Sequence, residues 1–196
     1  MLGQNERKHY LNISGGKIVR RTDSGKTETF DFVEGDLERI YRRDREFRGE
    51  KVPYWYLDLR DPQTGETYSL GINASSGVWR SLILSLGSCK NFLLPIRISP
   101  YRKGDFDRVS VYSGGERLDW VSDLPPVEEI EVGGRRIKSV EKREEFFSQI
   151  VQRINTTLGN GQRPPPGDSL PSGCSITPPG RRKSPREQNP TETDTR

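Results

Sequence analysis

Residues 34–50, with the sequence EGDLERIYRRDREFRGE, decide the fold of this chain, and their pattern is compatible with two structures. Leu37, Ile40 and Tyr41 have the spacing of one face of a helix. Glycines bracket the same stretch, as is typical of one long strand that turns into the next segment. We favour the strand, with the helix as the alternative.

The strand would also sort the charges of residues 34–51, which hold six acidic and six basic residues. Side chains alternate between the two faces of a strand, and all the acids between residues 36 and 46 take even positions. A helix, or a β-bulge in mid-strand, would place acidic and basic side chains on the same face again. On an uninterrupted strand one face carries only basic and aromatic side chains, namely Arg39, Tyr41, Arg43, Arg45 and Phe47.

The segments after residue 53 have clearer patterns. Residues 54–60 and 68–72 each alternate between apolar and polar side chains, and they flank a turn at residues 61–66, as in a β-hairpin. Residues 78–86 carry apolar residues at helical spacing, with a serine before them as the N-cap. Two further strands follow. Their inward residues are Leu94, Ile96 and Ile98 in the first and Val109 and Val111 in the second, with an extension to Leu118 and Trp120.

The two ends of the chain differ from this middle part. Residues 139–158 have an amphipathic helical pattern, so we expect one helix docked on the domain. From residue 159 the composition is dense in Pro, Gly, Ser and charge, which is typical of a disordered tail. We therefore expect one domain at residues 1–158 and a tail at 159–196. Three additional N-terminal strands are expected near residues 10–13, 17–21 and 27–32.

The composition fits one domain of ordinary size and excludes several functional classes. The chain has 196 residues, of which 30% are hydrophobic and 31% charged, and a formal charge of only +4. No run approaches the roughly 20 apolar residues of a membrane-spanning helix, and the start lacks the apolar core of a secretory signal, so we expect a cytoplasmic protein. Cys89 and Cys174 are too far apart for a disulfide framework or a zinc site, and His9 has no nucleophile motif beside it. We therefore expect no enzyme activity, no cofactor and no metal.

With the strand at residues 34–50, the order becomes three strands, a helix and two strands, which is the order of an oligonucleotide-binding (OB) barrel. The predicted fold is mainly β. It is a five-stranded OB-like barrel with extra N-terminal strands, a short helix between strands 3 and 4, and a C-terminal amphipathic helix.

Residues 17–86, from KIVRRTDSG to SLILSL, followed by LPIRISPYRKGDFDRVSVYSGGERLDW (94–120) and LPPVEEI (124–130), resemble single-stranded-DNA-binding proteins of tailed phages and related bacterial elements. The likeness covers residues 15–158. It rests on the order of the elements and on spaced glycine, aromatic and apolar residues. It implies a protein of DNA replication or recombination, in the host cytoplasm if phage-encoded. Many members of that class end in an acidic tip that recruits partners, whereas this chain ends PTETDTR after a basic RRKSPR.

The alternation of side chains between the two faces of each strand identifies the candidate binding residues. If the apolar residues of each strand point inward, tyrosines and arginines recur together on the outer surface. Single-stranded nucleic acid uses this combination, because bases stack on aromatic rings while cations follow the phosphates. The same residues also suit an ordinary solvated surface, with tyrosine present for its β propensity. The predicted binding residues are Arg39, Tyr41, Arg43, Arg45, Tyr54, Tyr56, Arg60, Arg97, Tyr101, Arg102, Lys103, Arg108 and Tyr112.

The sequence therefore predicts a non-enzymatic protein that coats single-stranded DNA without base specificity. Its expected partners are single-stranded DNA and replication or recombination proteins, and no membrane. A protein-interaction or scaffold module, in which the tyrosines form a protein interface, is the alternative from another class. RNA binding is a further alternative, because stacking and phosphate contacts serve both polymers.

Overall fold

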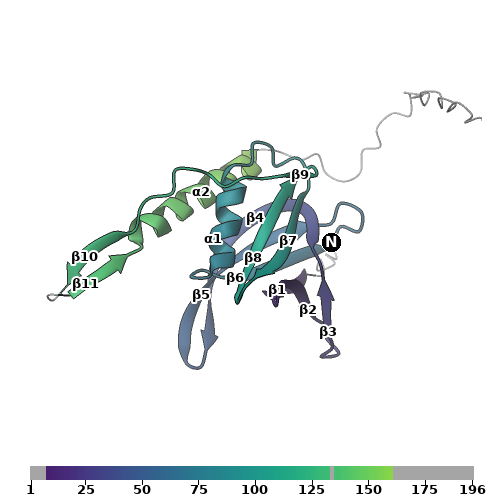
Figure 1. Cartoon of the computed structure of the whole chain (residues 1–196). Helices are drawn as coiled ribbons and strands as arrows, with labels where there is room; N and C mark the ends of the chain where they lie inside the picture. The colour runs from purple at the N-terminus through teal and green to yellow at the C-terminus, as the bar shows by residue number, and fades with distance from the viewer. Residues whose placement is uncertain (1–7, 133–134, 161–196) are drawn as a thin grey trace, which may run out of the picture. The chain divides into compact units, whose positions relative to one another are not determined.

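The structure is a computed structural model that describes residues 8–132 and 135–160 (Figure 1). The described elements are β1 (Lys8–Ser14), β2 (Lys17–Arg21), β3 (Thr27–Phe30), β4 (Val33–Phe47), β5 (Glu50–Arg60), β6 (Thr67–Asn73), α1 (Gly77–Gly87), β7 (Ile96–Lys103), β8 (Phe106–Ser113), β9 (Glu116–Arg117), β10 (Glu128–Val132), β11 (Arg135–Ser139) and α2 (Glu141–Asn160). The prediction of a mainly β fold is confirmed.

The stretch that decides the fold is a strand, so the helical alternative is wrong. β4 pairs antiparallel with β5 along most of its length, from Asp36 to Phe47. Arg48 and Gly49 form the turn between them, with φ of 54° and 82°. Two consecutive residues with positive φ match the twist of the flanking strands, which favours a tight hairpin over a continuing helix. A bulge lies between Leu37 and Arg39, before the basic stretch. Side chains therefore alternate regularly from Arg39 onward, and the predicted basic and aromatic residues stay on one face.

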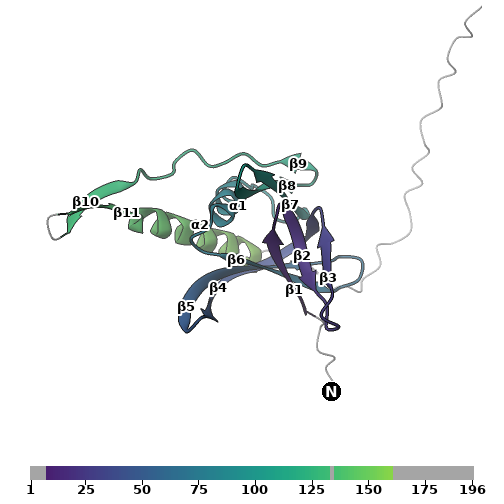
Figure 2. The same ribbon diagram turned by 60° about the horizontal axis from the view of Figure 1, so that its bottom comes forward.

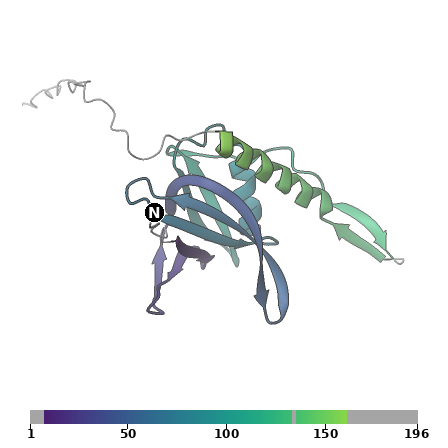
Figure 3. The same ribbon diagram turned by 180° about the vertical axis from the view of Figure 1, so that it is seen from behind.

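Strands β1 to β9 form one large sheet in the order β3-β2-β1-β6-β5-β4-β7-β8-β9, and β10 and β11 form a separate two-stranded sheet. The N-terminal strands, which we expected as additions to the barrel, extend this sheet because β1 pairs in parallel with β6. β4 is long and strongly curved, and it pairs with β5 along most of its length and with β7 at residues 33–35 (Figure 3). β7 and β8 therefore lie across from β5 and β6 rather than beside them (Figure 2).

The core fills the space between these layers. Leu57, Leu59, Leu70, Ile98 and Val111 enter it from both layers, and all five are fully buried. Burying a side chain of this size contributes about 1.5–3 kcal/mol each, so the inward strand faces dominate the stability of the fold. Both helices add to the same core.

The helices begin and end close to the predicted positions. Ser76 caps α1, since its hydroxyl accepts a hydrogen bond from the backbone N–H of Trp79 at 3.1 Å. α2 covers residues 141–160 and continues two residues beyond the predicted boundary. The predicted tail lies outside the described residues from residue 161 on. Within the described part of the chain, neither helix has the length and apolar character needed to cross a membrane.

Two details of the predicted strands are wrong. Leu94 precedes Pro95 outside β7 and is 43% exposed, because β7 begins only at Ile96. The strand extension to Trp120 ends early: β9 has two residues, and Trp120 is 54% exposed. The hairpin β10–β11 before α2 was not predicted.

α2 also protects the edge of β4 where β7 no longer pairs with it. The side-chain amide of Asn155 accepts a hydrogen bond from the backbone N–H of Ile40 at 2.9 Å. The same amide donates a hydrogen bond to the backbone carbonyl of Ile40 at 2.7 Å. This amide takes the place of a neighbouring strand, since unpaired strand edges invite association with other chains.

Candidate nucleic-acid interface

The outward side chains of β1, β4, β5 and β6 form one continuous surface, because paired residues of neighbouring strands share a face of the sheet. Arg39 lies opposite Asp58, Tyr41 opposite Tyr56, and Arg43 opposite Tyr54. The parallel pairing of β1 with β6 adds its outward side chains to the same surface. We call this surface the tyrosine–arginine face; it consists of Lys8, Tyr10, Asn12, Arg39, Tyr41, Arg43, Arg45, Tyr54, Tyr56 and Asp58.

Stacked rings form the centre of the tyrosine–arginine face. The rings of Tyr41 and Tyr56 stack with centroids 5.3 Å apart and planes 14° apart. Gly71 leaves room for this arrangement, since a Cβ at that position would lie 3.1 Å from both the ring of Tyr56 and the guanidinium of Arg45. Tyr56 points outward as predicted, but it is only 5% exposed because these neighbours cover it. The prediction that it offers an exposed ring is therefore wrong.

Guanidinium groups lie over the tyrosine rings of the face. Arg39 and Arg43 lie over the ring of Tyr41, with their guanidinium carbons 5.0 and 5.4 Å from its centroid. Arg45 lies over the ring of Tyr54 at 4.6 Å and over that of Tyr56 at 5.2 Å. A guanidinium is planar and stacks on aromatic surfaces, so these side chains offer flat cationic surfaces to a ligand.

A buried carboxylate organises one end of the face. Asp58 is 1% exposed and accepts hydrogen bonds from Lys8 at 2.8 Å, Arg39 at 2.6 Å and Ser69 at 2.7 Å. Burial would raise the pKa of Asp58, but the hydrogen bonds from Lys8, Arg39 and Ser69 outweigh it, so the pKa lies below its ordinary value. Asp58 is therefore ionised near neutral pH and holds two of the cations in place.

The other cations of the face are free to bind an anion. Arg43 and Arg45 form no ion pair with any residue in the described part of the chain, and Arg45 instead donates to the hydroxyl of Tyr56. The face has four cations and one carboxylate, so it is basic although the whole chain is nearly neutral.

A groove of about 460 Å³ opens at the edge of the face. Asn12, Tyr54 and Asn73 line it on the sheet side, and Phe106 and Arg108 line it from β8. The structure thus brings the predicted residues Tyr54 and Arg108 to one groove. Phe106 is 66% exposed, and its ring adds to the surface available for stacking.

Comparisons with known protein families, with curated proteins and with solved structures find no match to this chain. The candidate interface therefore rests on its geometry alone.

Four predicted residues are not on the tyrosine–arginine face. Arg97, Tyr101 and Tyr112 lie on the outward face of β7 and β8, and Arg102 lies near the end of β7. The inward faces of this layer and of β5 and β6 share one core, so their outward faces turn away from each other, except near the β7–β8 turn, where Phe106 and Arg108 line the groove beside Tyr54. Arg97 is also engaged elsewhere: it pairs with Glu34 at 2.7 Å and lies over the ring of Phe32.

Two further predicted residues lie at the periphery. Arg60 points outward at the end of β5, with its guanidinium 3.8 Å from the carboxylate of Glu38. Lys103 is exposed at the end of β7, beside the turn to Phe106.

Sequence reasoning missed Lys8, Tyr10 and Asn12. They reach the face only through the pairing of β1 with β6, which joins segments about 60 residues apart in sequence. No local pattern carries that information. Phe106 was also missed, although the alternation of β8 places it on the same outward face as Arg108.

Proposed function

We propose that the tyrosine–arginine face binds single-stranded DNA without sequence specificity, and that the protein coats such DNA during replication or recombination. The observation that carries the proposal is that Arg43 and Arg45, which form no ion pair with a described residue, lie over tyrosine rings across β4 and β5. Bases stack on aromatic and guanidinium planes whatever their sequence, and cations attract every phosphate alike.

The topology of the sheet supports the finer proposal of an OB-like barrel. β4–β5, β5–β6, β4–β7 and β7–β8 are paired, with α1 between β6 and β7, as in the strand order of OB folds. β1 takes the edge of β6. Oligonucleotides bind OB folds on the second and third strands and on two flanking loops. Here these are β5, β6 and the turns that present Phe47 and Phe106, which are 61% and 66% exposed.

The arrangement of the face suggests how a strand of DNA would bind. Arg45 lies over the rings of Tyr54 and Tyr56, so an incoming base stacks on the guanidinium or displaces it from the ring of Tyr54. Arg43 has no carboxylate partner among the described residues, and we assign it to a phosphate. A duplex hides its base faces, so the face favours unpaired strands over duplex DNA.

The proposal is tested by fluorescence anisotropy with a labelled oligo-dT of about 30 nucleotides, which exceeds the 4–16 nucleotides that one OB fold covers. Duplex DNA and RNA of the same length are titrated in parallel at two salt concentrations. Binding to oligo-dT is expected to be the tightest and to weaken with salt. Arg43→Ala should weaken it, and Arg97→Ala, on the other layer, should not.

The alternatives predict other outcomes of the same titration. A protein-interaction module would bind all three nucleic acids weakly and with little dependence on salt. An RNA-binding protein would favour the RNA, because it would recognise the 2′-hydroxyl that distinguishes RNA from single-stranded DNA. Either result would overturn the proposed function.

A further inference from the structure

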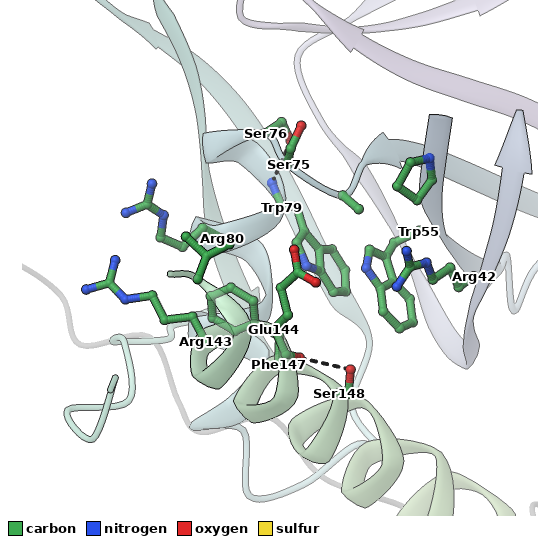
Figure 4. A pocket seen from close by; sticks show the side chains of 13 residues that line it. Arg42, Trp55, Ser75, Ser76, Trp79, Arg80, Arg143, Glu144, Phe147 and Ser148 are labelled. Carbon is green, nitrogen blue, oxygen red and sulfur yellow. Dashed lines mark hydrogen bonds between the residues drawn. The ribbon is translucent and has the colours of Figure 1, made fainter. Parts of the chain in front are cut away.

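A second candidate site lies on the inward side of the β4–β5 hairpin. It is a pocket of about 210 Å³ between this hairpin, the start of α1 and the first turns of α2 (Figure 4). Arg42 and Trp55 are cross-strand partners and line it. Their neighbours Arg43 and Tyr54 belong to the tyrosine–arginine face on the other side of the same two strands. The pocket therefore opens on the other side of the hairpin from the tyrosine–arginine face, and its lining shares only Ser76 with the groove beside that face.

The floor of the pocket is aromatic and rigid. The indoles of Trp55 and Trp79 stack with centroids 4.8 Å apart and planes 8° apart. Trp79 is 1% exposed and Phe147 is 8% exposed, so the core holds both in place. A preformed apolar floor of this kind accepts one flat or branched apolar side chain at a small cost in ordering.

The rim of the pocket is basic. Arg42, Arg80 and Arg143 line it, with Arg80 and Arg143 extending to one side of the indoles and Arg42 on the other (Figure 4). Arg143 is held by a hydrogen bond from its Nε to the carbonyl of Pro125 at 2.8 Å. None of the three forms an ion pair with a described residue. Like charges around one cavity repel each other, and an anionic ligand would relieve that repulsion.

Glu144 indicates which anionic ligand fits. Its carboxylate lines the same pocket and has no cationic partner among residues 8–132 and 135–160 (Figure 4). Glu144 is exposed, and a ligand that offers hydrogen-bond donors as well as negative charge would contact both this carboxylate and the arginines. A phosphodiester backbone has no donor, whereas a peptide has an N–H at almost every residue.

We propose that this pocket binds an acidic peptide segment of a partner protein, which places one aromatic or leucine side chain on the indoles and carboxylates on the arginines. The peptide backbone donates to Glu144. The proposal goes beyond DNA binding and does not depend on it.

The test uses the full chain and a fluorescein-labelled peptide, Asp-Asp-Asp-Phe-Asp-Asp-Asp, in an anisotropy titration. A peptide with serine in place of phenylalanine tests the apolar anchor. Arg80→Glu reverses an exposed charge on the rim, and Lys90→Glu, an exposed cation outside the pocket, is the matched control. Circular dichroism verifies that both variants are folded.

The phenylalanine peptide is expected to bind the wild-type chain and the Lys90→Glu variant alike. Arg80→Glu should weaken it about tenfold, the equivalent of one charge-assisted contact, and the serine peptide should bind at least about tenfold more weakly. Equal affinity of the two peptides, or of wild type and Arg80→Glu, would overturn the proposal.

Oligo-dT separates this proposal from the proposed function. Arg80→Glu should leave oligo-dT affinity within about twofold of wild type, since the pocket lies outside the tyrosine–arginine face. If Arg80→Glu weakens oligo-dT as much as the peptide, the pocket belongs to the DNA interface and the peptide proposal fails. If the peptide binds as expected while oligo-dT does not bind at all, only the proposed function fails.

Discussion

The guanidinium carbon of Arg45 lies 4.6 Å from the ring centre of Tyr54, and both residues are on the outward face of one hairpin. The half-buried ring of Tyr54 also lines the groove that Arg108 shares. Tyr54→Ala removes both the ring and the support of Arg45, so we expect oligo-dT binding to weaken by about 1–3 kcal/mol, the usual value of one stacked base. Fluorescence anisotropy measures this. Tyr112→Ala on β8 is the control, because Tyr112 pairs with Arg97 away from the groove. An equal loss in both variants would contradict the assigned face.

Tyr56 is expected to serve stability rather than direct contact with bases. It is 5% exposed and packs against Tyr41 and Gly71. Tyr56→Ala should lower the free energy of unfolding by about 3–5 kcal/mol, as is typical of a buried aromatic residue cut to alanine. Tyr56→Phe keeps the ring and loses only the hydrogen bond from Arg45, so it should cost about 1 kcal/mol. Urea denaturation compares the two; equal costs would show that packing of the ring is not the main contribution.

The salt dependence of DNA binding reports the phosphate contacts. For single strands, the logarithm of the binding constant falls with the logarithm of salt concentration by about 0.7 for each phosphate contact. Arg43→Ala should therefore make the slope less steep by about 0.7 and weaken binding to oligo-dT and oligo-dC alike. Titrations at several salt concentrations measure the slope. An unchanged slope would remove Arg43 from the phosphate contacts.

We expect the protein to lose stability in acid, because the ion pairs of Asp58 require its ionised carboxylate. Its pKa is lower in the folded protein than the ordinary value of 3.8, so the ion pairs with Lys8 and Arg39 stabilise the fold fully above that value. Their contribution is lost as the pH falls through the lowered pKa of the folded state. Asp58→Asn should be less stable than wild type at pH 7, and the difference should shrink toward pH 2. Thermal unfolding across this range checks the prediction. A difference independent of pH would mean that the charge of Asp58 contributes nothing.

Asn155 is expected to be a stability residue, and it is not part of the tyrosine–arginine face. Its amide satisfies both the N–H and the carbonyl of Ile40. Asn155→Ala leaves two backbone groups without a partner, so we expect a loss of about 2–4 kcal/mol in the free energy of unfolding. Thr156→Ala changes the exposed neighbour and should have little effect. Urea denaturation compares the two variants, and equal stabilities would refute the role assigned to the amide.

Much of the local structure follows from the sequence because it depends on neighbours along the chain. The alternation of residues 54–60 and 68–72, the N-cap before α1 and the periodicity of α2 are each set within a few residues. The sorting of charge on β4 also follows from alternation, once that segment is known to be a strand. Residues 34–50 themselves were ambiguous, because their apolar spacing suits a helix as well, and pairing with β5 decides between the two.

Sequence by itself determined that tyrosines and arginines would share a strand face, because alternation is a property of a single strand. Only the tertiary structure decided which of them meet. It added Lys8 and Tyr10 through a parallel pairing with β6, covered Tyr56, and turned Arg97 and Tyr112 away on the other layer. These outcomes depend on contacts between segments far apart in sequence and on the curvature of β4, and no local pattern of residues records either.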